Sequence, residues 1–222
     1  MRRTSSSGCY EGSTGASPIR RRRCSVYSAS AGFDAPSPIT VPSGRSPDWN
    51  ASRRGSAAIP SDQLSAIAQT HELFTRGGID YWLFGGWAVD FQAGSITRSH
   101  DDIDIAVWLD DHDRIARLLS AEGWKHAPEA DEDGGTGYER DAVRLELTFL
   151  VPGDGGEVYI PLRAGRVLWS DEPMSTDVLE LADVHARVLG LAALKRGKSQ
   201  PRDDPVEAAK DRADFATLSR LA

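Results

Sequence analysis

Two aspartates separated by one residue carry the clearest chemical signal in this chain. Asp102 and Asp104 stand at the start of a strand-like run that extends from Ile103 to Leu109. Carboxylates at positions i and i+2 of a strand point to the same face of its sheet. Two adjacent like charges disfavour each other's ionisation unless a cation lies between them. The spacing therefore predicts a site for hard metal ions, and a solvated strand edge of alternating polarity is the alternative.

A glycine pair precedes these aspartates. Gly85 and Gly86 follow a short apolar run, Tyr81 to Phe84, and stand before a short helix predicted from Trp87 to about Phe91. Glycine lets backbone N–H groups approach a phosphate closely, and the N-terminus of a following helix adds a positive dipole. Taken alone, the two glycines are equally well explained as a plain turn. Next to the aspartates, they indicate phosphate binding.

Glu146 supplies a candidate third carboxylate. It lies in the run Arg144 to Phe149, in which the odd-numbered positions are apolar, so its side chain faces the other way. Alone, it would be a half-exposed strand residue. Three carboxylates and a triphosphate can hold two divalent ions about 3.5–4 Å apart, which stabilise the attacking and leaving oxygens of an in-line phosphoryl transfer. Oxygen ligands favour Mg²⁺ over zinc, because no cysteine or clustered histidine accompanies them.

Charge is distributed unevenly along the chain. Of its 222 residues, residues 1–60 hold nine arginines and three acidic residues, and residues 61–222 hold 17 basic and 30 acidic ones. Because of this excess of acidic residues, the segment 61–222 is a poor candidate for sequence-independent DNA binding, which needs a basic face. It suits a cationic small-molecule partner, although a merely solvated acidic surface is equally compatible. No apolar run approaches the ~20 residues that a membrane helix needs.

Residues 1–60 are expected to be a disordered, low-complexity tail, because they are rich in Ser, Gly, Arg and Pro and lack an apolar period. The run Arg20 to Arg23 could contact nucleic acid or anionic lipid, or be solvated. The segment lacks the apolar region of a secretory signal, and a transit peptide or a mis-assigned start remains an alternative. Both cysteines, Cys9 and Cys24, lie here, so the body has no cysteine site and a reducing, cytoplasmic location is the default.

The elements needed to position these residues follow from periodicity and turn signals. We expect a helix from about Ser61 to Gly77, strands at 81–84, 103–109, 138–141, 144–151, 157–161 and 166–169, and helices at 110–122, about 181–196 and 205–221. This order predicts an α/β (α+β) fold with a small mixed sheet flanked by helices. The phosphoryl-transfer chemistry would occupy a domain at 61–222, with a catalytic core at 61–170 and a helical C-terminal part at 171–222.

The ordered motif from Gly85 to Asp90, followed by Thr97 to Asp104, resembles the antibiotic nucleotidyltransferases. The most similar members are the aminoglycoside 2''-adenylyltransferases and the lincosamide nucleotidyltransferases of the DNA polymerase β-like superfamily. The resemblance is dense over residues 81–106 and looser over 61–80 and 107–151. Leu194-Lys195 and the run Lys210 to Asp214 are similar to the helical part of minimal nucleotidyltransferases, whereas residues 1–60 match nothing in the family.

The resemblance implies roles for the donor half of the site. Gly85 and Gly86 would hold the nucleotide phosphates, and Asp102 and Asp104 would ligate Mg²⁺. Glu146 falls where the family has a third carboxylate, usually Asp, which binds metal or acts as the base on the acceptor hydroxyl. The longer Glu side chain leaves both roles open.

Three basic residues would complete the nucleotide side. Arg98 and His100 would organise the triphosphate, and an ion pair or cap to Asp90 or Asp101 is the alternative for them. Lys195 would reach the phosphates from the helical part, or lie on the surface as most lysines do.

The implied reaction is transfer of AMP from ATP, or of another nucleoside monophosphate, to a hydroxyl of a small-molecule acceptor such as an aminoglycoside or lincosamide antibiotic. The acidic cluster Glu129, Asp131, Glu132 and Asp133 is a candidate acceptor-binding surface or a solvated loop. A nucleotidyltransferase that modifies a protein or tRNA, as toxins do, is an alternative. A non-catalytic nucleotide-binding module is a further alternative, although two adjacent aspartates without a bound cation would destabilise it.

Overall fold

A computed structural model describes residues 60–128, 131, 133–172 and 174–221. The predicted N-terminal tail, apart from Pro60, lies outside the described residues, and so do Glu129 and Glu132 of the acidic cluster. Within the described part, no helix combines the length and the apolar character needed to cross a membrane.

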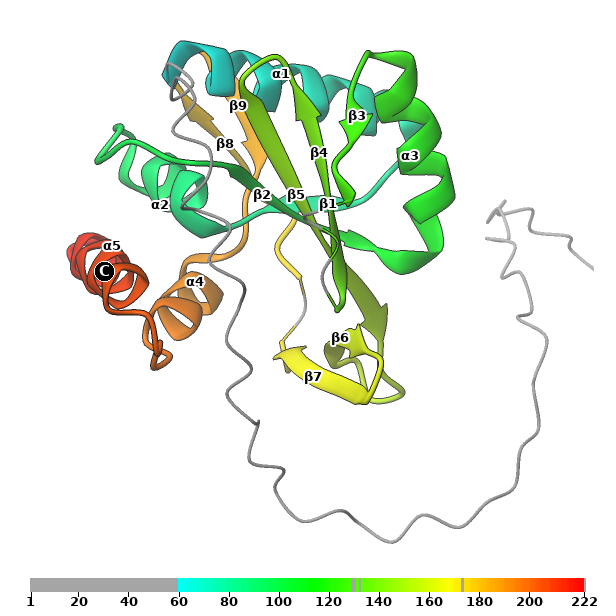
Figure 1. Cartoon of the computed structure of the whole chain (residues 1–222). Coiled ribbons are helices and arrows are strands. Elements are labelled where there is room, and N and C mark those ends of the chain that lie inside the picture. The colour runs from blue at the N-terminus through cyan, green and yellow to red at the C-terminus, as the bar shows by residue number, and fades with distance from the viewer. Residues whose placement is uncertain (1–59, 129–130, 132, 173, 222) are drawn as a thin grey trace, which may run out of the picture. The chain divides into compact units, whose positions relative to one another are not determined.

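Helices and strands alternate over residues 60–126, a run of strands follows up to residue 187, and two helices end the described part of the chain (Figure 1). The helices are α1 (Pro60–Gly77), α2 (Gly85–Ala93), α3 (His112–Ala121), α4 (Leu191–Lys198) and α5 (Pro205–Ser219), with a 3₁₀ turn at Leu109–Asp111. The strands are β1 (Tyr81–Leu83), β2 (Ile103–Trp108), β3 (Lys125–His126), β4 (Gly135–Arg140), β5 (Val143–Pro152), β6 (Val158–Leu162), β7 (Gly165–Ser170), β8 (Val178–Leu181) and β9 (Val184–Arg187). The glycine pair itself forms the first turn of α2, which starts two residues before the predicted helix.

The described residues form a seven-stranded mixed sheet with the order β1-β2-β5-β4-β3, which β6 and β7 extend from β5. β2 and β5 run parallel, whereas the other paired strands of this sheet are antiparallel. The predicted mixed-sheet α/β (α+β) fold is therefore confirmed. The predicted hairpin is also present as β4 and β5, with Asp141 in the left-handed region at φ 55°.

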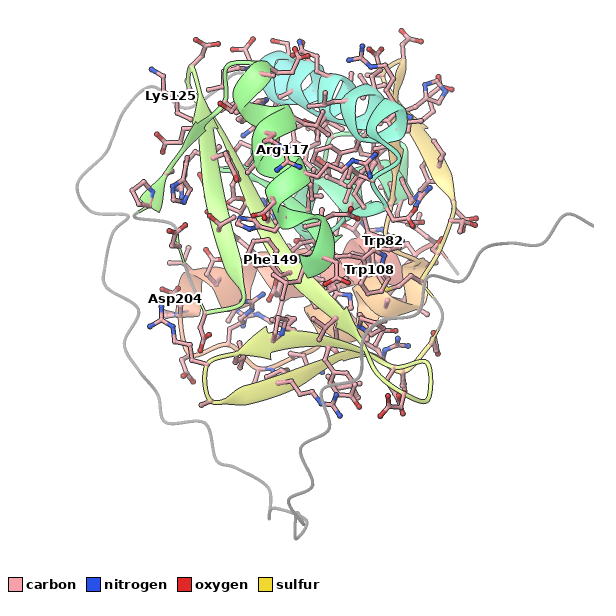
Figure 2. The ribbon with its side chains drawn as sticks, turned by 90° about the vertical axis from the view of Figure 1, so that its right-hand side faces the viewer. Trp82, Trp108, Arg117, Lys125, Phe149 and Asp204 are labelled. Atoms are coloured by element: carbon pink, nitrogen blue, oxygen red, sulfur yellow. The ribbon has the colours of Figure 1, made fainter. Side chains whose placement is uncertain are left out.

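The two faces of the sheet differ in what covers them. On one face, Ile103 and Ile105 of β2 and Leu145 of β5 are almost fully buried in the main core, to which α1 and α3 contribute Phe74 and Ile115. On the other face, a smaller cluster forms beneath the β6–β7 hairpin from Trp82, Ala106, Leu150 and Val158. Trp82 and Trp108 meet there edge to face, with ring centroids 5.4 Å apart (Figure 2).

The helix predicted from Leu181 to Arg196 is wrong in its first half. Residues 178–187 form the β8–β9 hairpin, whose turn residues Ala182 and Asp183 have φ 50° and 63°. A two-residue turn with both residues left-handed matches the twist of paired strands, and Asp tolerates this conformation. The hairpin lies against α1, where Ala186 is fully buried, and it continues the sheet edge through a bridge between Leu83 and Val188. Burial of alternate residues thus outweighs the helix-forming composition, and helix begins only at α4.

The last predicted helix is confirmed as α5. Asp204 caps it, because its Oδ1 accepts hydrogen bonds from the backbone N–H groups of Val206 and Glu207 at 2.7 and 3.1 Å, and Pro205 opens the first turn. α5 packs against α4 and against α2, so the C-terminal helices lie beside the glycine turn (Figure 1).

One buried hydroxyl ties α1, β1 and β9 together and gives a test of this packing. The Tyr81 hydroxyl accepts from the Arg187 backbone N–H at 3.0 Å and is hydrogen-bonded to His71 Nδ1, 2.7 Å away. Burial raises the pKa of Tyr81 to about 12. Tyr81→Phe leaves both partners unsatisfied and should lower the free energy of unfolding by about 1–2 kcal/mol in urea denaturation.

The matched control for that experiment is Tyr159→Phe, which keeps the ring under the guanidinium of Arg166. It should change stability by less than about 0.5 kcal/mol, as most substitutions at partly exposed positions do. Equal effects of the two substitutions would show that the Tyr81 hydroxyl does not hold the three elements together.

Candidate active site

The structure brings together the three carboxylates that the sequence singled out. Asp102, Asp104 and Glu146 each offer one oxygen, and these oxygens all lie within 4.8 Å of one another. The parallel pairing of β2 with β5 sets Asp104 directly beside Glu146, and Asp102 stands just before β2 on the same face. All three side chains are half-buried, so the cluster is partly shielded from water.

The electrostatics of the cluster fit a cation. Burial raises the pKa of Asp104 well above its ordinary value, and the charges of Asp102 and Glu146 raise it further. Burial also raises the pKa of Asp102. The surroundings of these carboxylates therefore hold too little positive charge to stabilise the ionised form. A bound divalent ion would supply the missing charge. A donor set made only of carboxylate oxygens suits Mg²⁺ and similar hard ions.

The two glycines allow the close approaches on which the site depends. Gly85 has φ +66°, and a Cβ added to it would collide with the Asp104 carboxylate. A Cβ on Gly86 would lie 2.5 Å from Nη2 of Arg98 and equally close to the ring of His100. No side chain caps the N-terminus of α2 in the described structure, so the first N–H groups of this helix remain available to an anion.

Asp90 holds the segment that leads to the aspartates. Its fully buried carboxylate accepts from the backbone N–H and the hydroxyl of Thr97, at 3.0 and 2.5 Å, and from His100 Nε2 at 2.6 Å. Arg98 Nη1 donates to His100 Nδ1 at 3.0 Å. Because Arg can only donate, His100 Nδ1 is the acceptor in this contact, and Nε2 is the ring nitrogen that faces Asp90. The alternative left open for His100, a pairing with Asp90, is thus present.

Arg98 pairs not with Asp90 or Asp101 but with α5. Its Nε and Nη2 donate to the two carboxylate oxygens of Asp214 at 3.1 and 3.0 Å, the strong bidentate arrangement. Lys198 Nζ lies 2.9 Å from Asp214 and 2.9 Å from Asp211, and Arg202 Nε lies 2.7 Å from Asp211. Among the described residues, three cations therefore share two carboxylates beside the glycine turn.

The two α5 carboxylates are structural anchors for these cations. Asp211 and Asp214 are only 4% and 2% exposed. Burial alone would raise the pKa of Asp214, but hydrogen bonds from Arg98 and Lys198 outweigh it and leave this pKa below its usual range. Buried carboxylates paired in this way fix the positions of their partners.

Sequence reasoning missed the cations that face the carboxylate cluster. Lys198 and Arg202 are the basic residues whose charges oppose the raised pKa of Asp104, whereas Lys195 is half-buried one turn earlier on α4. A signal existed in the spacing of Asp211, Asp214 and Leu218, which recur on one face of α5 and are all buried. Inward-facing carboxylates on a helix require cations nearby. The phosphate-binding role of Lys195 stays a prediction.

The described members of the acidic cluster have partners within the fold. Asp131 Oδ1 accepts from the Thr136 hydroxyl at 2.6 Å and lies 2.8 Å from His126 Nε2, and Asp133 accepts from the Arg163 backbone N–H at 2.7 Å. Thr136 is paired with Leu147, so its side chain lies on the core face of the sheet. Glu146 is one residue away from Leu147, and its side chain therefore lies on the other face. The acceptor-binding role of Glu129, Asp131, Glu132 and Asp133 also stays a prediction.

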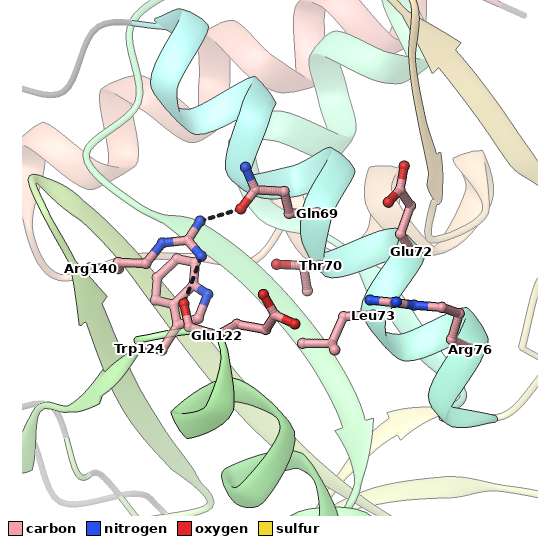
Figure 3. Close-up of a pocket in the computed structure, with 8 residues that line it drawn as sticks. All are labelled: Gln69, Thr70, Glu72, Leu73, Arg76, Glu122, Trp124 and Arg140. Atoms are coloured by element: carbon pink, nitrogen blue, oxygen red, sulfur yellow. Dashed lines mark hydrogen bonds between the residues drawn. The ribbon is translucent and has the colours of Figure 1, made fainter.

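Two hollows on the described surface lie apart from the carboxylate cluster. The smaller, of about 110 Å³, is bounded by α1 and by Arg140, which lies over the Trp124 ring at 4.6 Å and donates to Gln69 Oε1 at 2.6 Å (Figure 3). It is too small for a nucleotide. The larger, of about 660 Å³, lies between α3 and the core face of β4 and β5, where Tyr138 and Phe149 line it. The sheet separates it from the carboxylates.

Comparison with known proteins identifies related sequences. A family model described as aminoglycoside-2''-adenylyltransferase matches residues 66–192, more than half of the chain. A protein from Klebsiella pneumoniae named 2''-aminoglycoside nucleotidyltransferase is 36% identical over 47 residues, which are 21% of this chain and 27% of that protein. The match thus spans about a quarter of the length of this curated relative.

Solved structures share the fold. The lincomycin-bound lincosamide antibiotic adenylyltransferase LnuA superposes with a TM-score of 0.57 at 18% identity and covers 75% of this chain and 99% of its own. ANT(2'')-Ia in complex with adenylyl-2''-tobramycin gives a TM-score of 0.52 at 18% identity and covers 72% of this chain and 94% of its own. At this level of identity the likeness is one of fold.

The raised pKa of Asp104 predicts a stability change that depends on pH. Because the native pKa of Asp104 is raised, its contribution favours folding below the ordinary carboxyl pKa of about 3.9 and is lost as pH rises through the native pKa. Asp104→Asn removes the ionisable group, and with it the loss of folding stability as pH rises. In metal-free buffer the variant should therefore be about 1 kcal/mol more stable than the wild type at pH 7 and equally stable near pH 3. Urea denaturation with a chelator present checks this, and a variant less stable at pH 7 would contradict it.

A second prediction separates backbone strain from contact with Asp104. Gly85 and Gly94 have nearly the same φ, +66° and +67°, but a Cβ on Gly94 meets no atom within 4 Å. Gly85→Ala and Gly94→Ala should both lose about 1 kcal/mol of stability from the left-handed backbone. Only Gly85→Ala displaces the Asp104 carboxylate, so only this variant should lose Mn²⁺ affinity, measured by electron paramagnetic resonance. Equal metal affinity in the two variants would refute the assigned contact.

Proposed function

The chain belongs to the aminoglycoside-2''-adenylyltransferase family, and from this premise we propose that it transfers a nucleoside monophosphate to a hydroxyl of a small-molecule antibiotic. The proposed donor is ATP, the cofactor is Mg²⁺, and the acceptor is of the aminoglycoside or lincosamide type. The observation that carries the proposal is the cluster of Asp102, Asp104 and Glu146 directly beside the uncapped start of α2. We expect the reaction to take place in the cytoplasm, where nucleoside triphosphates are available.

The triphosphate would lie between the glycine turn and the C-terminal helices. N–H groups of the first turn of α2 would donate to phosphate oxygens, as helix N-termini do. Arg98, Lys198 and Arg202 would supply positive charge, while Asp211 and Asp214 hold these cations in place. Such preorganised donors stabilise developing negative charge without having to rearrange during the reaction.

Asp102, Asp104 and Glu146 would hold the divalent ion, which when bound neutralises charge on the attacking and leaving oxygens. The chain's own contribution is geometric, because β2 and β5 fix the three carboxylates relative to the glycine turn. Positioning of donor and acceptor supplies much of the rate in such transfers. Glu146 would either complete the ligand set or take the proton from the acceptor hydroxyl.

The acceptor class is supported by the relatives and by charge. The relatives include an aminoglycoside nucleotidyltransferase, a lincomycin-bound adenylyltransferase and a complex with adenylyl-2''-tobramycin. Residues 61–222 carry 30 acidic against 17 basic residues, which suits a polycationic aminoglycoside. The same balance disfavours tRNA, whose binding needs neutralisation of many phosphates.

Mass spectrometry of the purified protein with Mg²⁺, each of the four nucleoside triphosphates and a mixed antibiotic panel tests this proposal. We expect a nucleoside monophosphate adduct on one antibiotic and release of pyrophosphate. Asp104→Asn should reduce turnover by about 10²–10³-fold or more, the size of effect seen when one electrostatic stabiliser is lost.

Asp113→Asn is the matched control for that variant, because Asp113 is an 89% exposed carboxylate on α3. It should keep full activity. If no antibiotic gains an adduct while a protein or tRNA added to the same mixture does, the acceptor assignment fails. If no nucleotide is consumed at all, the proposed activity fails.

A further inference from the structure

One cation contacts the carboxylate cluster from its own strand. Arg144 lies two residues before Glu146 on β5, so their side chains share a face of the sheet. Arg144 Nη2 donates to Glu146 Oε1 at 2.9 Å. Its Nε also lies 3.7 Å from Oε1 of Glu139 on the neighbouring strand β4. With 21% of its side chain exposed, the guanidinium is held in a partly desolvated position next to the proposed metal ligands.

The field of Arg144 reaches a second member of the cluster. Burial raises the pKa of Asp102, and the charge of Arg144 is the largest influence in the opposite direction. Arg144 therefore acts on two of the three carboxylates, whereas Lys198 and Arg202 act on Asp104. The cluster thus has a permanent positive charge next to it on β5.

We propose that Arg144 takes the place of a divalent cation on Glu146 and competes with it, so that the nucleotide-free protein binds metal weakly. The inference rests on the proposed function, because it takes these carboxylates as metal ligands. An ion that engages Glu146 must displace the guanidinium from Oε1 or bind close to its positive charge, and both lower affinity. The phosphates of the nucleotide would offset this repulsion, so metal would bind mainly together with the nucleotide.

The same contact explains how the fold tolerates three adjacent carboxylates. A guanidinium at hydrogen-bond distance partly neutralises Glu146 and limits the repulsion in the absence of metal. Arg144 would then be a positioning residue for Glu146 and a determinant of metal affinity, without itself touching the reacting atoms.

Mn²⁺ titration of the full-length protein, followed by electron paramagnetic resonance without nucleotide or acceptor, tests this inference. Arg144→Met removes the charge and keeps an apolar stem of similar length. The Mn²⁺ Kd should fall by about tenfold, the order expected when a unit charge a few ångströms from a divalent ion is removed in a high effective dielectric. With a non-hydrolysable ATP analogue present, the difference between variant and wild type should shrink.

Arg117→Met is the matched control, since Arg117 carries the same charge on the exposed face of α3 (Figure 2). Its Mn²⁺ Kd should stay within about twofold of the wild-type value, because salt screens distant exposed charges. Circular dichroism establishes that each variant is folded. If Arg144→Met does not fold, Arg144→Gln, which keeps a polar contact to Glu146 but no charge, gives the same comparison.

Unchanged Mn²⁺ binding in both neutral variants would overturn the competition, and weaker binding in both would show instead that Arg144 supports metal binding. The Asp104→Asn variant makes this failure distinguishable from failure of the proposed function. If Mn²⁺ binding persists in Asp104→Asn, the carboxylate cluster is not the metal site. If binding is lost in Asp104→Asn while Arg144→Met matches Arg117→Met, only the role of Arg144 is refuted.

Discussion

Repulsion among three half-buried carboxylates is the constraint around which this structure is organised. The parallel pairing of β2 with β5 sets Asp104 beside Glu146, with Asp102 adjacent, in a position where burial makes negative charge unfavourable. Such an arrangement is stable only if positive charge is close. The fold supplies part of it through Arg144, Lys198 and Arg202, and in the proposed function a divalent ion supplies the rest.

Two of these positive charges, those of Lys198 and Arg202, are themselves held by a second layer of carboxylates. Asp211 and Asp214 on α5 are buried and bind cations from α4, from the following loop and from the segment before β2. Arg98 joins this layer to His100, whose partner Asp90 lies inside α2. One continuous chain of polar contacts therefore connects α2 to the C-terminal helices. Since each carboxylate is buried, moving any cation would leave an unpaired charge in the interior.

Local sequence predicts features whose cause is local. The i and i+2 spacing of Asp102 and Asp104 fixes their common face as soon as a strand forms, and Pro205 marks the start of α5 because proline suits a first helical turn. The β8–β9 hairpin could not be predicted in this way. Its residues suit a helix by composition, and the strand conformation is selected by burial of Ala186 against α1 and by the bridge at Val188.

By itself, the sequence determined the family motif and the mixed α/β (α+β) architecture and predicted the donor side of the chemistry, since glycines and carboxylates at fixed spacing act through the backbone that carries them. Only the tertiary structure decided which charges meet. Arg98 and Asp214 are 116 positions apart along the chain, and no spacing rule relates them. Their pairing arises because α5 packs on α2, and the same packing brings Lys198, rather than Lys195, toward Asp104. Charge partners are chosen by proximity in the folded interior, where an unpaired ion is costly.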